Sequence, residues 1–160
     1  MSTQEENDNI IVRLATIDDL PAIFHLGEKV FTSGRLSNLY RSWDEFEVTS
    51  LFNLQPEHVL VAELEDQVIG FAIGSLVRKA RGAVTYGHLA WLGVDPEFGR
   101  TGVGGMLFDN FRKNMEEAGV QTLVVDTQAD NQPALEFFRE KGFSQPVRHV
   151  YMSLPLNKGS

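Results

Sequence analysis

The sequence of 160 residues contains no cysteine, no apolar run long enough to span a bilayer, and no basic-then-apolar signal at its N-terminus. These absences argue against a disulfide framework, a membrane-spanning helix and a secretory leader, and they predict a cytoplasmic protein. Basic side chains are also few, because 14 Lys and Arg face 22 Asp and Glu, for a net charge of -8. This balance argues against a general nucleic-acid surface and favours a cationic substrate such as an amine.

Apolar residues are plentiful enough for one core. They make up 42% of a chain whose length is typical of a single domain. Residues 1–9 are polar and acidic and carry no apolar period, so we expect a disordered lead-in there and one domain over residues 10–160.

The most informative stretch runs from Trp91 to Leu107, where an apolar run gives way to a glycine-rich turn and then to helical spacing. Gly102 and Gly104 remove side chains where backbone N–H groups must approach a ligand closely. The helix that follows directs the positive end of its dipole at the same place. The stretch therefore predicts a cradle for phosphates.

Two familiar nucleotide cradles do not match this spacing. The dinucleotide-binding fingerprint needs a third glycine where this sequence has Leu107. A P-loop needs Lys and then Ser or Thr directly after its last glycine, and Met106 and Leu107 follow Gly105 instead. In the alternative interpretation, these glycines only permit a tight turn from strand to helix and bind no ligand.

Hydrophobic spacing predicts the elements around the cradle. Strands are expected over residues 10–14, 59–64, 68–77, 86–94, 122–127 and 148–154, with a hairpin turn at Glu65-Asp66-Gln67 and a bulge at Gly93. Helices are expected after the capping residues Thr16, Ser42 and Asn131. A further helix carries Val103, Leu107, Phe111 and Met115 at four-residue spacing and ends near Gly119.

A second motif follows about thirty residues after the cradle. Its residues are Asn131, Ala134, Phe137, Phe138, Gly142 and Phe143. Together with Arg100-Thr101-Gly102-Val103-Gly104, this pattern resembles the two motifs of the GNAT superfamily of acetyl-coenzyme A-dependent N-acetyltransferases. The order of the expected elements from Ile10 to the C-terminus is similar to that superfamily as well.

The resemblance implies a single α/β domain of the α+β type, with a mixed, mostly antiparallel sheet flanked by helices. It implies acetyl-CoA as cosubstrate and direct attack in a ternary complex by a primary amine, either of a small molecule or of a peptide N-terminus. From the charge balance and the absence of a long apolar run we expect no nucleic-acid or membrane partner, and we expect no metal. A homodimer stays open. The residues it assigns to the cofactor are Leu92, Val94, Arg100, Thr101, Gly102, Val103, Gly104, Gly105, Asn131, Ala134 and Phe138.

Two positions depart from the family pattern. Gly99 stands where the cradle usually opens with Gln or Arg, although Arg100 lies beside it. Phe138 stands where the second motif usually carries a Tyr that protonates the leaving thiolate, and a phenyl ring donates no proton. This loss keeps open a non-catalytic acyl-CoA sensor or scaffold with the same fold.

Three side chains are candidates for proton transfer. The resemblance points to Asp126, where members that acetylate ribosomal-protein N-termini carry a carboxylate, and to His88 on the strand before the cradle. Tyr151 on the last expected strand is a replacement acid. Each has a structural alternative: a turn-capping Asp, a packed or solvated His, and a core Tyr. Arg35 and Arg41 are weaker candidates for binding a substrate carboxylate.

Overall fold

The computed structural model describes residues 9–31, 42–79 and 85–157, and residues 1–8 of the expected lead-in and both loop arginines lie outside the described residues. The chain divides into two compact units, Met1–Val125 and Asp126–Ser160, and each is described by itself. Among the residues that the structure describes, every helix is too short or too polar to cross a bilayer.

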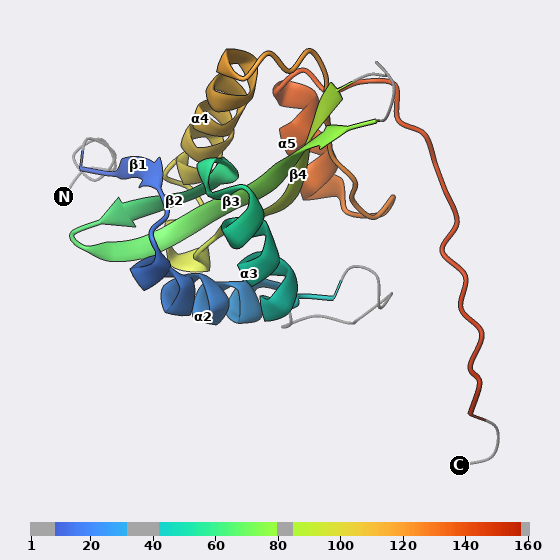
Figure 1. Ribbon diagram of the computed structural model, residues 1–160, viewed down its shortest axis with the longest axis horizontal. Helices are drawn as coiled ribbons and strands as arrows, with labels where there is room; N and C mark the ends of the chain where they lie inside the picture. The colour runs from blue at the N-terminus through green and yellow to red at the C-terminus, as the bar shows by residue number, and fades with distance from the viewer. Residues whose placement is uncertain (1–8, 32–41, 80–84, 158–160) are drawn as a thin grey trace. The chain divides into compact units, whose positions relative to one another are not determined.

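The first unit contains a five-stranded sheet (Figure 1), whose order is that of the sequence. Its strands are β1 (Ile11–Leu14), β2 (Val59–Leu64), β3 (Gln67–Arg78), β4 (Thr85–Val94) and β5 (Leu123–Val124). The first four strands pair antiparallel, and β5 runs parallel to β4. The predicted fold class, a mixed and mostly antiparallel sheet with helices, is therefore confirmed.

The hairpin between β2 and β3 is tighter than predicted. Leu64 pairs with Gln67, so the turn holds only Glu65 and Asp66, and Gln67 already belongs to β3. Both turn residues have positive φ, 50° and 65°, as a type I′ turn requires. This turn matches the right-handed twist of the strands, which is why two residues suffice.

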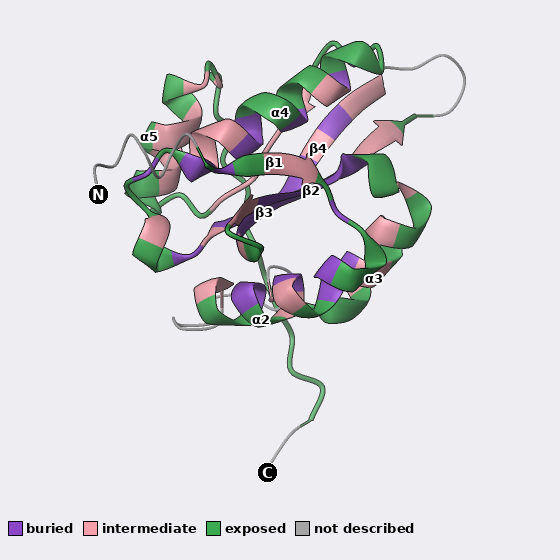
Figure 2. Ribbon diagram, turned by 90° about the vertical axis from the view of Figure 1, so that its left-hand side faces the viewer, coloured by how far each residue is buried: buried purple, intermediate pink, exposed green. Residues whose placement is uncertain are grey.

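Helices cover both faces of the sheet, and Figure 2 shows them as separate layers. One face carries α2 (Leu20–Phe31) and α3 (Glu45–Leu54), and the other carries α4 (Val103–Glu117). The short 3₁₀ turn η1 (Ile17–Asp19) leads into α2, and η3 (Pro56–His58) connects α3 to β2. The face of α2 and α3 buries a cluster of aliphatic and aromatic side chains, among them Ile23, Val48, Phe71, Ile73 and Trp91.

The predicted period of α4 is confirmed, because Val103, Leu107, Phe111 and Met115 are all buried. The helix ends in a Schellman motif. Gly119, at a φ of 84°, donates its N–H to the carbonyl of Glu116, and Val120 donates to Met115. The apolar stripe and the terminal glycine together hold α4 against the sheet in one register.

Two local predictions are wrong in detail. The cap of α3 is Asp44, whose carboxylate accepts the N–H of Phe46 at 2.9 Å, and Ser42 lies outside the helix. The bulge in β4 is at Ala90 and not at Gly93. Ile73 pairs with Trp91, but the next residue of β3, Gly74, pairs with Leu89, so Ala90 is the extra residue of β4. Gly93 is needed for another reason, since a Cβ there would stand 2.9 Å from the ring of Phe71.

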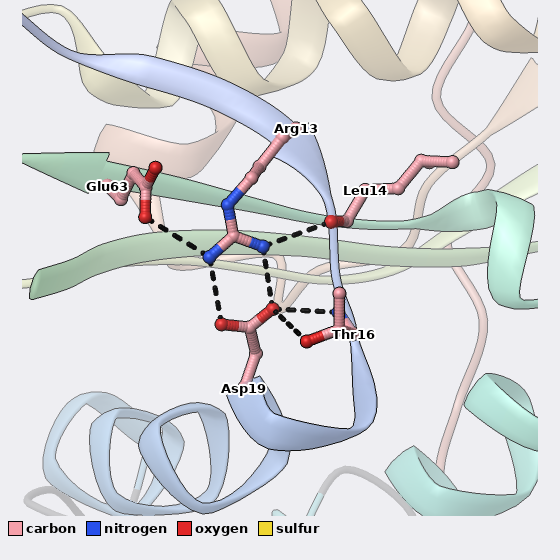
Figure 3. A network of polar contacts seen from close by, with 5 residues as sticks. All are labelled: Arg13, Leu14, Thr16, Asp19 and Glu63. Carbon is pink, nitrogen blue, oxygen red and sulfur yellow. Dashed lines mark hydrogen bonds and ion pairs between the residues drawn. The ribbon is translucent and has the colours of Figure 1, made fainter. Parts of the chain in front are cut away.

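An ion-pair network joins β1, η1 and β2 (Figure 3). The guanidinium of Arg13 donates to both carboxylate oxygens of Asp19, at 2.7 and 3.0 Å, and to Glu63 at 3.1 Å. Asp19 also accepts the backbone N–H of Thr16, as the predicted capping box requires. The hydrogen bonds from Arg13 hold the pKa of Asp19 below the ordinary aspartate value of 3.8.

Arg13→Met is expected to lower the free energy of unfolding by about 1–2 kcal/mol at neutral pH. Because the pKa of Asp19 is depressed in the folded state, this stabilisation is complete above the pKa of the unfolded chain. It is lost as pH falls through the lower folded-state value, so variant and wild type should converge in acid. Urea unfolding over a pH series measures the difference. Arg112→Met is the control, because its pair with Glu116 is exposed. A loss that is independent of pH would contradict the argument.

The second unit contains α5 (Gln132–Glu140), the predicted short amphipathic helix. The side chain of Asn131 caps it by accepting the N–H of Ala134 at 3.3 Å. A second Schellman motif closes it, with Gly142 donating to Arg139 and Phe143 to Phe138. The rings of Phe138 and Phe143 lie 5.4 Å apart, which supplies the apolar contact of that motif.

Two strand predictions near the C-terminus do not hold as made. The strand expected over residues 122–127 is reduced to Leu123 and Val124, and its residues are half-buried. No strand forms over residues 148–154, which are extended and exposed. The alternating apolar side chains there satisfy the strand pattern, but a strand also needs a hydrogen-bonded ladder with a second backbone, and residues 148–154 belong to no ladder of the sheet.

Candidate active site

The predicted cradle is a sequence of tight turns between β4 and α4. The 3₁₀ turn η4 (Pro96–Phe98) follows β4 directly. Phe98 donates its N–H to Asp95, and Gly99 donates to Pro96, so each turn closes on the previous one. Thr101 is buried, and both its N–H and its hydroxyl donate to the carbonyl of Phe98. Thr101 was expected to bind the cofactor, but its N–H and its hydroxyl both stabilise the turn.

Four consecutive backbone N–H groups open α4 without an acceptor. Those of Gly102, Val103, Gly104 and Gly105 form no hydrogen bond within the described part of the chain, and the first helical bond runs from Met106 to Gly102. No side chain among the described residues caps this end. A helix leaves such donors unpaired, and they suit an anion. The residues present therefore fit a pyrophosphate.

Gly102 has the conformation that the cradle needs. Its φ is 82°, in the left-handed region, and a Cβ built on it would meet no atom within 4 Å. Glycine is therefore required there by the backbone and not by crowding. Arg100 is exposed beside it, while the neighbouring Gly99 has an ordinary φ of -64°.

Asp95 anchors the cradle to the rest of the unit. Its buried carboxylate accepts the N–H of Glu97 at 3.1 Å and the ammonium of Lys29 at 3.2 Å. Its own N–H donates to Ile69 of β3 at 2.8 Å. The last turn of α2 and the sheet are thereby both joined to the start of the cradle. The sequence Asp-Pro-Glu is typical of an N-cap, so the role of Asp95 as the cap of η4 has a local signal. The ion pair of Asp95 with Lys29 has no such signal in the sequence.

The end of β4 leaves one edge open. Its ladder with β5 contains only Gly87–Leu123 and His88–Val124, whereas its ladder with β3 continues to Val94. Because Asp95 donates its N–H toward β3, alternation directs the N–H of Val94 to the opposite edge, where the ladder with β5 has ended. Val94 therefore presents its backbone N–H at this open edge.

The structure decides which face of the sheet each β4 residue occupies. A Cβ on Gly87 would meet Met115 of α4, so alternation places His88 on the face of α2 and α3. A Cβ on Gly93 would meet Phe71 and Phe31 on that same face, so Leu92 and Val94 point toward α4. His88 is half-buried and pairs with Ser75 and Val124.

A family model described as the Acetyltransferase (GNAT) family matches residues 20–143, which is most of the chain and includes the whole cradle. The chain belongs to the GNAT family. It is similar to a [Ribosomal protein bS18]-alanine N-acetyltransferase of Salmonella typhimurium (strain LT2), with 27% identity over 143 residues that cover 88% of this chain and 85% of that protein.

Solved structures share the GNAT fold. An aminoglycoside acetyltransferase from an uncultured soil metagenomic sample, crystallised with trehalose, aligns with a TM-score of 0.73 at 22% identity and covers 92% of this chain and 98% of its own. The ribosomal-protein-S18-alanine N-acetyltransferase from Escherichia coli aligns with a TM-score of 0.68 at 23% identity, covering 86% and 79%. The predicted acetyl-CoA-dependent acetyltransferase class is thus confirmed by family.

The remaining candidate residues from the sequence analysis belong to the second unit. Asp126 is its first residue and lies beyond the end of β5. Tyr151 lies in the extended segment, so the strand on which it was expected does not form. Asn131, Ala134 and Phe138 take part in the caps of α5. Phe138 thus has a structural use in which no hydroxyl is required.

Away from the cradle, a pocket of about 370 Å³ lies at the opposite end of β3, lined by Gln55, Glu57, His58, Leu76 and Arg78. The side-chain amide of Gln55 bonds both backbone groups of Leu76, at 2.6 and 3.1 Å, as a neighbouring strand would. Burial lowers the pKa of His58, so its imidazole is neutral at physiological pH. The sequence analysis did not anticipate this pocket.

Proposed function

We propose that this GNAT protein transfers the acetyl group of acetyl-CoA to a primary amine, using the four open N–H groups from Gly102 to Gly105 to hold the pyrophosphate. The single observation that carries the proposal is this run of unpaired donors at the start of a 15-residue helix. Acetyl-CoA would supply a thioester carbonyl that is open to attack by an amine.

The chain supplies the other groups for acyl transfer. The N–H of Val94, which faces the open edge of β4, is the proposed donor to the thioester oxygen. Asp126 or His88 is the proposed base that receives the proton of the attacking amine. Tyr151 is the proposed acid, because Phe138 cannot donate. If Tyr151 does not act, the thiolate would leave unprotonated, which a thiol pKa of about 8.5 allows.

Calorimetry with acetyl-CoA and a thiol-release assay across amines and peptide N-termini test the proposal together. Saturable binding with turnover on an amine supports it. Tight binding without turnover on any acceptor would instead favour the acyl-CoA sensor that Phe138 leaves open. Absence of binding would refute the cradle itself.

Gly102→Ala should weaken acetyl-CoA binding by about tenfold, because a strained residue at the helix start disturbs one charge-assisted bond to phosphate. Gly119→Ala is a matched control. Both glycines flank α4 with φ near 80°, at 82° and 84°, and neither has an atom within 4 Å of an added Cβ. The two variants should therefore lose similar stability, about 1–2 kcal/mol, and differ only in acetyl-CoA affinity. Equal affinities would count against the cradle.

The acceptor is proposed as a primary amine of a small molecule or of a peptide N-terminus. The homodimer and the cytoplasmic location stay predictions from the sequence. Sedimentation of the purified protein, with and without acetyl-CoA, tests the first, and fractionation of the source cells tests the second.

A further inference from the structure

Glu47 is a half-buried carboxylate that no cation of the described residues neutralises. It lies in the first turn of α3, and its Oε1 accepts the indole N–H of Trp91 at 3.1 Å. Within the part of the chain that the structure describes, no Lys, Arg or His pairs with it, although Arg13, Lys29 and Arg112 all have carboxylate partners. Carboxylates removed from water are normally paired with a cation, so this one has capacity left for a ligand.

Aromatic side chains fix the position of this carboxylate. Trp91 is only 4% exposed and packs against Phe31 and Trp43, with ring centroids 4.7 and 5.2 Å away. Because the indole is held by this packing, a Glu47 side chain that keeps the hydrogen bond cannot swing freely into solvent. The carboxylate is therefore held beside β4 by a rigid donor, with Oε2 left for another partner.

The location of Glu47 links it to the proposed reaction. Trp91 lies on β4 one residue before Leu92 and three before Val94, where the edge of β4 is open. Trp91 and His88, one of the two proposed bases, lie on the same face of the sheet, the face of α2 and α3. Glu47 thus borders that face next to the strand that presents Val94.

We propose that Glu47 binds a second positive charge of the acceptor, so that the preferred substrates are diamines or polyamines rather than monoamines. This inference rests on the proposed function. The amine that attacks must be neutral, and a carboxylate would favour its protonated form, so Glu47 is better suited to an ammonium elsewhere on the same molecule. The net charge of -8 would add a weaker, long-range attraction for such acceptors.

The test compares hexamethylenediamine with hexylamine, which differ in one terminal amine. Wild type should show a higher kcat/KM for the diamine, and Glu47→Gln should reduce the ratio of the two values by about tenfold. The amide oxygen introduced by this substitution still accepts the bond from Trp91, so the fold should persist. Added salt should also lower the ratio in wild type. Glu45→Gln is the matched control, because Glu45 is exposed in the same helical turn, and its ratio should equal that of wild type.

A binding measurement separates this inference from the proposed function. The two tryptophans of the sequence, Trp43 and Trp91, pack against each other, so intrinsic fluorescence reports on this cluster. In the presence of coenzyme A, hexamethylenediamine should change the fluorescence of wild type and not of Glu47→Gln, even if no acetyl transfer occurs. An equal diamine preference in both proteins, or an equal fluorescence titration, would overturn the role of Glu47 while leaving the acetyltransferase proposal intact.

Discussion

Gly27→Ala is expected to destabilise the protein by about 1–3 kcal/mol, although alanine is the better helix former by about 1 kcal/mol. Gly27 lies inside α2, and a Cβ there would stand 2.0 Å from the six-membered ring of Trp43. That ring cannot simply move away, since Phe31, Phe71 and Trp91 pack around it. Overpacking therefore outweighs the gain in helix propensity. Thermal and urea unfolding measure the change.

The clash can be tested by removing its other partner. In a Trp43→Ala background the indole is gone, and Gly27→Ala should then stabilise α2 by the propensity term alone. The sign of the substitution should thus reverse between the two backgrounds. Stabilisation in the wild-type background would show that the indole has room to move, and the packing argument would fail.

Loss of the base is expected to have the largest effect on the reaction. Of Asp126→Asn and His88→Gln, the variant that removes the true base should lose about 100-fold in kcat. The other variant should retain most of the wild-type rate. Initial-rate measurements of thiol release from about pH 6 to 9, a range that includes the ordinary titration of an imidazole and of a peptide α-amino group, provide the comparison.

Folding and cofactor affinity must be controlled in this comparison. His88 is paired on both sides within the sheet, so its variant needs an unfolding curve and an acetyl-CoA titration before its rate is interpreted. If both variants keep the wild-type kcat and pH profile, the amine loses its proton to solvent. Neither residue would then be the base, and both would have structural roles.

The sequence predicted those parts of the site that depend on neighbours along the chain. An unpaired run of N–H groups arises wherever a glycine-rich turn opens a helix, and Gly102 to Gly105 show that pattern directly. Asn131 and Gly142 likewise act on groups within a few residues, so the ends of α5 were predictable. Four-residue spacing identified the buried face of α4 because helical geometry repeats locally.

Long-range contacts decided what the sequence did not. Alternation along β4 has the same period whichever face is buried, so the side of His88 depended on the packing of Gly87 against α4. The bulge at Ala90 follows from pairing with β3 and not from any glycine in β4. Residues 148–154 have strand spacing without a strand, because pairing requires a second backbone that spacing does not supply.

By itself, then, the sequence of this GNAT protein determined the glycine-rich turn that opens α4, the caps of α5 and the family, since each depends on residue types at short, fixed spacing. Only the tertiary structure joined Lys29 to Asp95, Glu47 to Trp91 and Gly27 to Trp43. The residues of these pairs are brought together by the burial of apolar side chains between α2, α3 and the sheet, and that packing leaves no periodic signal in the sequence.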